Sequence, residues 1–267
     1  MSVRIYTGPH ADRHRGGGPR LMRLLVWLLT LGVVGLEIAY ALAEGAQRRD
    51  LTIAVVVTFF LASTLHALTS RGFWWTAGFL VVTVGGGLAV EAIGVRTGWP
   101  FGDYVYASGR LGPTVLGVPV VIPLAWSMMA YPTLIAARTL CRGALTTPLV
   151  GAWALASWDL FLDPMMTGQG FWRFTQKGVA LPRSPGVPLS NYAGWLLVAF
   201  AMMLLLDQLP RKHARDGAPA VLFLWTYVSS VVGNAFVFDR PWVAFYGGVA
   251  MGLVAIPYAW VLWSGRP

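Results

Sequence analysis

The chain alternates between long apolar runs and short polar connections over nearly its whole length. Eight runs approach the roughly 20 residues that a helix needs to cross a bilayer. They cover residues 21–43, 51–69, 73–93, 116–140, 145–162, 192–209, 219–237 and 241–263. This pattern predicts an all-α polytopic membrane protein, a bundle of about eight transmembrane helices in a single domain over residues 21–265. The connections after the third and fifth runs are long and rich in Gly, Pro and aromatic residues, and with eight helices they lie on the same side.

Composition supports a membrane protein rather than a soluble domain. Of the 267 residues, 56% are hydrophobic and only 12% are charged, whereas soluble domains average about 25% charged residues. The net charge of +9 is carried by short loops and by a basic tail over residues 1–20, which we expect to be disordered. With the N-terminus inside, 12 Lys and Arg lie on the inner side and 8 on the outer side. By the positive-inside rule this predicts a multi-pass protein of the cell membrane with cytoplasmic termini, and the charge does not indicate nucleic acid binding.

Cysteine and histidine usage excludes several classes of site. The single cysteine, Cys141, excludes an intramolecular disulfide and a thiolate metal cluster. The four histidines are scattered without the spacing of metal ligands. Only His66 lies within an apolar run, on the side away from the other polar residues, so a Ser–His or Cys–His nucleophile is not supported. A phosphate-binding P-loop motif is also missing.

The most informative stretch is residues 157–166, which contains Asp159 and Asp163. Carboxylates four residues apart lie on one face of a helix, about 5–6 Å apart at Cβ. Pro164 disfavours helical geometry at Asp163, which predicts that the helix ends there. A charged residue at membrane depth costs at least ~2.5–3.5 kcal/mol, so the pair predicts a functional site. The alternative is a helix end whose acids reach interfacial water or pair with loop Arg and Lys.

The two long connections have related sequences. Gly117-Val118-Pro119 precedes Trp126, and Gly186-Val187-Pro188 precedes Trp195 with the same spacing. Glu91 lies 26 residues before the first motif, and Asp159 lies 27 residues before the second. Internal repeats of membrane proteins often place a site at their interface. The repeat therefore predicts that Glu91 and Asp159 pair across a pseudo-twofold axis.

Carboxylic acids in an aromatic, apolar cavity are suited to protonating an alkene. Desolvation favours the neutral form of a carboxyl group, which can then donate a proton. Trp and Tyr faces stabilise the resulting carbocation, and a second carboxylate or an Asn can position water. These residues permit hydration, cyclisation or isomerisation of a polyene. The D-x-x-x-D spacing of the two aspartates leaves a Mg²⁺–diphosphate site open, and a chain of acids leaves a proton relay open.

The sequence resembles a bacterial and archaeal family of membrane carotenoid biosynthesis proteins, which includes bisanhydrobacterioruberin hydratase and γ-carotene 1′,2′-hydratases. The resemblance covers the middle of the chain. It is carried by the stretches 91–95, 97–106, 117–126, 158–165 and 186–195, with strings such as Thr-Gly-Trp-Pro-Phe-Gly-Asp-Tyr and Trp-Asp-Leu-Phe-Leu-Asp-Pro-Met.

This resemblance implies addition of water across the terminal C1=C2 double bond of an acyclic carotenoid end group, without a metal or cofactor. Its partners would be the carotenoid, water, the lipid bilayer and other membrane enzymes of the pathway. Asp159 or Asp163 is then expected to protonate C2, and Glu91 or Asp103 to orient and deprotonate water. The residues expected to line the substrate site are Phe101, Tyr104, Trp126, Trp158, Asn191 and Trp195.

Other interpretations stay open from the sequence. The alternatives are a Mg²⁺-dependent prenyltransferase, a lycopene-cyclase-like enzyme, and a non-catalytic carotenoid-handling or transport protein. Individual Trp residues are typical of interfacial belts. Asn191 is also placed to cap the sixth helix, and Asp103 with Tyr104 to tie down a loop.

Overall fold

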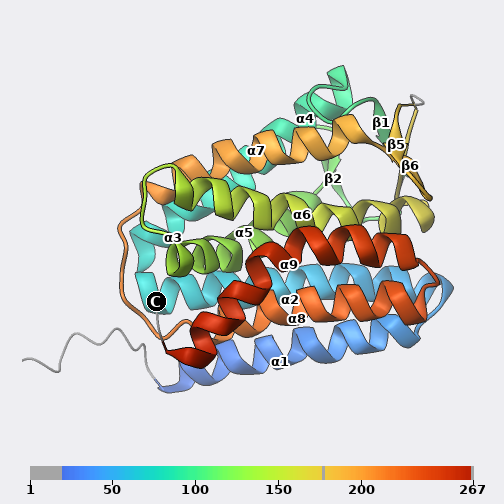
Figure 1. Ribbon diagram of the computed structural model, residues 1–267. Coiled ribbons are helices and arrows are strands. Elements are labelled where there is room, and N and C mark those ends of the chain that lie inside the picture. Colours follow the sequence, from blue (N-terminus) through green and yellow to red (C-terminus); the bar gives the residue numbers. More distant parts are fainter. Residues whose placement is uncertain (1–19, 176–177, 266–267) are drawn as a thin grey trace, which may run out of the picture.

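The computed structural model describes residues 20–175 and 178–265, so the predicted N-terminal tail lies outside the described residues except for Arg20. The described chain is a bundle of helical rods (Figure 1). In chain order these are α1 (Arg20–Leu42), α2 (Gly45–Arg71), the rod α3–η1–α4 (Phe73–Leu80, Val81–Gly85, Gly86–Thr97), α5 (Val121–Leu140), α6 (Thr146–Gly168), α7 (Leu189–Asp207), the rod α8–η2 (Gly217–Val232, Gly233–Val237) and α9 (Pro241–Ser264). The segments η1 and η2 are π-helical.

Six of these rods are long and apolar enough to cross a membrane, which makes the chain a helical multi-pass membrane protein. The two others, α5 and α6, contain polar residues that lower their hydropathy, and most of their side chains are buried. A helix enclosed by protein does not need a lipid-compatible surface on every side. Figure 1 shows α5 and α6 inside the bundle, with α1, α2 and α8 on one side and α7 on the other. The predicted count of eight membrane spans stays a prediction.

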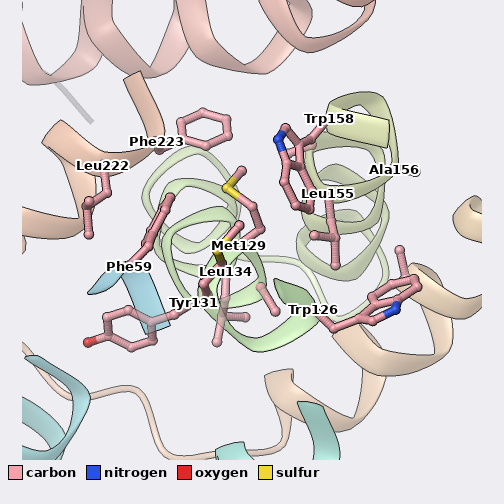
Figure 2. Close-up of a cluster of buried hydrophobic side chains, with 14 of the residues drawn as sticks. Phe59, Trp126, Met129, Tyr131, Leu134, Leu155, Ala156, Trp158, Leu222 and Phe223 are labelled. Atoms are coloured by element: carbon pink, nitrogen blue, oxygen red, sulfur yellow. The ribbon is translucent and has the colours of Figure 1, made fainter. Parts of the chain in front are cut away.

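The hydrophobic core is built around α5. Figure 2 shows Met129 and Leu134 of α5 at its centre, with Phe59 and Phe223 on one side and Trp158 on the other. All five side chains are buried. Helices α2, α7, α8 and α9 pack against the central pair formed by α5 and α6.

One predicted helix boundary is wrong in a way that affects the site. We expected the fifth helix to end at Asp163, but α6 continues through Pro164 to Gly168. Proline is tolerated inside membrane helices where neighbouring groups bond the freed backbone. After the proline, Thr167 Oγ1 donates to the Asp163 carbonyl at 2.7 Å and Arg240 Nη1 donates to the Pro164 carbonyl at 2.8 Å, so the last turn of α6 is held by side chains as well as by its backbone. Asp163 therefore lies inside a continuous helix rather than at its end.

The long connections form short antiparallel strand pairs at one end of the bundle (Figure 1). β1 (Tyr104–Tyr106) pairs with β4 (Trp172–Phe174), which joins the two connections to each other. The other pairs are β2 (Thr114–Val115) with β3 (Val118–Pro119) and β5 (Ala180–Leu181) with β6 (Ser184–Pro188). The strand pair β2–β3 explains why α5 begins at Val121 and not at residue 116 as predicted.

Candidate active site

Asp159 and Asp163 are held together by one amide group. Asn191 Nδ2 donates to Asp159 Oδ2 at 2.8 Å and also donates to Asp163 Oδ2. All three side chains are at most 3% exposed. Asn191 lies in the first turn of α7, which begins at Leu189, and its side chain is directed at the acids instead of capping the helix. The alternative in which these acids reach water or pair with loop Arg and Lys is therefore wrong.

Glu91 of α4 is the third buried carboxylate, and three donors converge on it. Its Oε2 accepts hydrogen bonds from the hydroxyls of Tyr104 at 2.6 Å and Tyr106 at 2.8 Å, and its Oε1 accepts one from Trp126 Nε1 at 2.9 Å. Tyr104 approaches closely because Gly94 follows Glu91 by one turn: a Cβ at Gly94 would lie 2.9 Å from the Tyr104 hydroxyl. Hydrogen bonds from such donors stabilise the ionised carboxylate.

Contacts between the two halves of the site follow a local twofold axis. In the β1–β4 pair, Val105 lies opposite Arg173, with Tyr104 opposite Phe174 and Tyr106 opposite Trp172. Tyr104 and Trp172 each follow their carboxylate, Glu91 or Asp159, by 13 residues, so the register is symmetric under the repeat. This register agrees with the repeat predicted from the sequence, which stays a prediction.

The two tryptophans of the predicted repeat lie against each other. The rings of Trp126 and Trp195 stack with centroids 3.8 Å apart and planes 12° apart. Phe101 lies 6.4 Å from both rings, and Trp158 meets Trp195 edge-on at 6.3 Å. The predicted aromatic residues therefore form one connected cluster.

A small cavity of about 40 Å³ separates the two halves. Glu91, Asp163 and Asn191 contribute its polar groups, and aromatic side chains supply much of the remaining wall. A buried water needs roughly 10–15 Å³ of such volume together with two to four polar partners. The cavity can therefore hold water between Glu91 and Asp163. Asp159 is fully buried one turn earlier in α6 and does not line it, so the acid that faces Glu91 is Asp163 and not Asp159 as predicted.

A larger, mainly apolar cavity of about 300 Å³ adjoins the small one. Its walls come from α5, α6 and β4 on one side and from α1, α2, α8 and η2 on the other. Four side chains, Ile122, Ala125, Leu162 and Trp172, line both cavities. Its volume falls within the range of small-molecule sites. An apolar ligand in the larger cavity can therefore approach the carboxylates through this shared wall.

The structure brings together all but one of the predicted site residues. Phe101, Tyr104, Trp126, Asn191 and Trp195 line the small cavity, whereas Trp158 lines the large one.

Asp103 is the exception. It is half-buried, and its carboxylate lies against Gly98. Its backbone carbonyl accepts a hydrogen bond from Thr175 N at 2.8 Å, and it is not among the residues lining either cavity. Asp103 precedes β1, which begins at Tyr104, so its position next to Tyr104 in the sequence does not bring it to either cavity.

The sequence analysis missed two residues of the candidate site. Tyr106 donates to Glu91, and Trp172 Nε1 donates to Asp163 Oδ1 at 2.9 Å. The repeat spacing that relates Trp172 to Tyr104 could have identified the second of these, and the strand alternation from Tyr104 to Tyr106 the first.

Comparison with known proteins decides the family. The family described as carotenoid biosynthesis protein matches residues 51–258, which is more than half of the chain. This chain belongs to the carotenoid biosynthesis protein family. The sequence resemblance is thereby confirmed, and the matched range contains Glu91, both aspartates and Asn191.

One curated protein similar to this chain is the bisanhydrobacterioruberin hydratase of Haloarcula japonica. It is 35% identical over a 189-residue alignment that covers 66% of this chain and 59% of the relative. The matched segment thus spans less than two thirds of the relative's length. No solved structure matches the chain.

Proposed function

We propose that this chain is a carotenoid hydratase that adds water across the terminal C1=C2 double bond of an acyclic carotenoid end group. The observation that carries the proposal is the apolar cavity that adjoins a small, carboxylate-lined pocket. Family membership and the similarity to a hydratase support a carotenoid as the substrate class.

Asp163 is the proposed proton donor. Asp159 and Asp163 share the Asn191 amide, and two neighbouring buried carboxyl groups are stabilised when one of them holds a proton. Asp163 lines the small cavity, whereas Asp159 does not. In the first step the π electrons of the double bond form a new bond from C2 to the Asp163 proton. This leaves a tertiary cation at C1 and a carboxylate on Asp163.

The aromatic cluster stabilises that cation. Trp126, Trp172 and Trp195 line the small cavity, and the faces of such rings attract positive charge. No lysine or arginine is among the residues that line either cavity. This lining favours a neutral substrate that becomes cationic, and it offers no partner for a diphosphate leaving group. The lining of the cavities therefore supports a Mg²⁺-dependent prenyltransferase less well than a hydratase.

Glu91 is the proposed base. A water molecule in the small cavity attacks C1 through its oxygen, and Glu91 accepts the proton that the water loses. Tyr104, Tyr106 and Trp126 orient Glu91 through hydrogen bonds that a carboxylate acceptor strengthens. Proton return from Glu91 to Asp163 through water in the same cavity restores the resting state. The product is a tertiary alcohol, and atoms balance because the alkene has gained one H₂O.

The test is pigment analysis in a host that accumulates an acyclic carotenoid. Liquid chromatography with mass spectrometry should show a gain of one water per modified end group. Asp163→Asn and Glu91→Gln should each lower conversion by about 10²-fold or more, at unchanged protein level. Asp103→Asn separates the two candidate bases: a loss equal to that of Glu91→Gln would show that the assignment of the base to Glu91 is wrong.

Other pigment outcomes identify the competing functions. No added mass with any acyclic carotenoid would reject the hydratase and favour a carotenoid-handling or transport protein. A changed retention without added mass would indicate cyclisation or isomerisation, as a lycopene-cyclase-like enzyme produces.

We further propose that the protein resides in the cell membrane with both termini in the cytoplasm. The excess of Lys and Arg on the inner connections supports this orientation. The small cavity would then lie towards the outer end of the helices, beneath the strands that join the two long connections.

A further inference from the structure

A third cavity, of about 580 Å³, lies at the end of the bundle that carries the strands (Figure 1). It is lined by the end of α6, by β4 and β6, and by the start of α9, and its volume falls within the range of small-molecule sites. Phe174 lines both this cavity and the small one, but none of the buried carboxylates of the candidate active site lines it. The proposed hydration step uses none of its polar groups.

Three arginines from separate segments line this third cavity. Arg173 is the middle residue of β4, Arg183 lies in the turn between β5 and β6, and Arg240 directly precedes α9. Among the residues that the structure describes, none of the three forms an ion pair, although Asp239 lines the same cavity. Because arginine is always charged in proteins, three unpaired cations against one carboxylate indicate an anionic ligand.

Two of these arginines are held in position by neighbouring groups. Arg240 Nη1 donates to the Pro164 carbonyl at 2.8 Å, and its guanidinium lies against Gly168, where any side chain would collide with it. The Arg183 guanidinium lies 4.7 Å from the centre of the Trp242 ring, which is a cation–π contact. A positioned guanidinium loses less conformational freedom when it binds an anion, and its planar fork matches the oxygens of a phosphate.

The first turn of α9 adds to the attraction for an anion. Pro241, Trp242 and Val243 line the third cavity. Within the described chain, this turn contains no acidic residue and receives no side-chain cap. The N–H groups at the start of a helix have no partner inside the helix, so they favour negative charge and bind phosphate.

Aromatic side chains beside the third cavity are typical of the bilayer surface. Trp242 and Phe245 are exposed at the start of α9, and the Tyr246 ring contacts both of them. The Tyr246 hydroxyl donates to the Pro182 carbonyl at 3.2 Å, which joins α9 to the turn that carries Arg183. Trp and Tyr are enriched at the level of the lipid headgroups. The cavity is therefore placed where a headgroup can reach it.

We propose that the third cavity binds the phosphate of an anionic phospholipid. The three arginines and the N–H groups at the start of α9 surround the phosphate. The acyl chains extend along α9, where Phe245, Val249 and Leu253 are exposed at a spacing of four residues and therefore lie on one face. This apolar face distinguishes a lipid from a free phosphate ion. The proposal does not depend on the hydratase assignment.

The experiment is a lipid competition with the purified full chain in a neutral detergent. The probes are phosphatidylglycerol, which has a net negative charge, and zwitterionic phosphatidylcholine with identical acyl chains. An equimolar mixture is added, free lipid is removed by gel filtration, and the retained lipids are quantified by liquid chromatography with mass spectrometry. Unmodified protein should retain phosphatidylglycerol about fivefold or more over phosphatidylcholine, since each arginine near an anionic lipid contributes a factor of this order.

Two variants and a control test the role of the arginines. Arg173→Gln combined with Arg183→Gln should reduce the preference to less than twofold. Both side chains are exposed, and Arg183→Gln alone, which should weaken the preference in the same direction, decides the test if the double variant does not fold. Arg96→Gln combined with Arg110→Gln is the matched control. These arginines are also exposed, in the last turn of α4 and in the connection that follows it, but they do not line the third cavity. The control has the same net charge as the double variant and should keep the full preference.

The outcomes separate a local lipid site from other attractions. Equal retention of both lipids by unmodified protein overturns the site. A preference that survives in the Arg173→Gln, Arg183→Gln protein, or that the control loses to the same extent, would show that overall charge attracts the lipid and would also overturn it. Displacement of phosphatidylglycerol by an equal concentration of inorganic phosphate would show that the ligand is a free anion. A preference lost only when the cavity arginines are changed supports the site, whether or not the chain hydrates a carotenoid.

Discussion

Two substitutions of Glu91, to Leu and to Gln, should differ in their effect on thermal stability but not in their effect on hydration activity. Glu91 accepts three hydrogen bonds from buried or half-buried donors, the hydroxyls of Tyr104 and Tyr106 and the indole N–H of Trp126. Glu91→Leu leaves all three donors without this acceptor. A buried donor without a partner costs about 1–3 kcal/mol, so the loss should be at least ~3 kcal/mol. In a domain of this size each 1 kcal/mol lowers the Tm by about 2–4 °C, which predicts a fall of roughly 6–12 °C.

Glu91→Gln should destabilise the protein less than Glu91→Leu, because the hydrogen-bond donors around Glu91 fix the orientation of the new amide. The amide oxygen can replace Oε2 and accept from both tyrosines, but the amide nitrogen then faces Trp126 Nε1, another donor. Only one of the three bonds is lost, so the cost should be about 1–3 kcal/mol. Hydration should nevertheless fall as far as in Glu91→Leu, since an amide cannot act as the base.

The measurement is thermal unfolding of detergent-solubilised protein, paired with pigment analysis of the same variants. A double-mutant cycle of Glu91→Gln with Trp126→Phe should show coupling of about 1 kcal/mol or more, because the second change removes the donor left facing the amide. Additive effects, or a Glu91→Leu protein as stable as the unmodified chain, would refute the network as described here.

Three further predictions concern the acid pair, metal dependence and orientation. Asn191→Leu removes the amide that joins Asp159 to Asp163, so conversion should fall at least tenfold in the pigment assay; unchanged conversion would show that the amide does not position the acid. Treatment of membranes with EDTA should leave conversion unchanged, and activity restored only by added Mg²⁺ would favour the transferase. Cys141, the single cysteine, directly follows α5 on the predicted inner side, so a membrane-impermeant maleimide should label it only in inside-out vesicles; labelling in intact cells would reverse the orientation.

The carboxylate site shows where sequence reasoning succeeded and where it failed. The helical spacing of Asp159 and Asp163 placed both acids on one face, and the repeat placed Trp126 and Trp195 in equivalent positions. The rule that proline ends a helix failed at Pro164, since α6 continues to Gly168 and Arg240 holds its last turn by a hydrogen bond to the Pro164 carbonyl. A local rule cannot include an Arg240 that lies 76 residues away in the chain.

Hydrophobic periodicity and composition alone determined the class of protein, since only apolar helices of this length satisfy their backbone within a bilayer. The repeated motifs determined which residues correspond. Which carboxylate faces the water-sized cavity, and that Asp103 does not, was decided only by the tertiary structure. The same holds for Arg173, Arg183 and Arg240, which lie in three separate segments and meet at one cavity. These facts depend on the direction of each side chain and on contacts between distant segments, and neither is encoded in local sequence pattern.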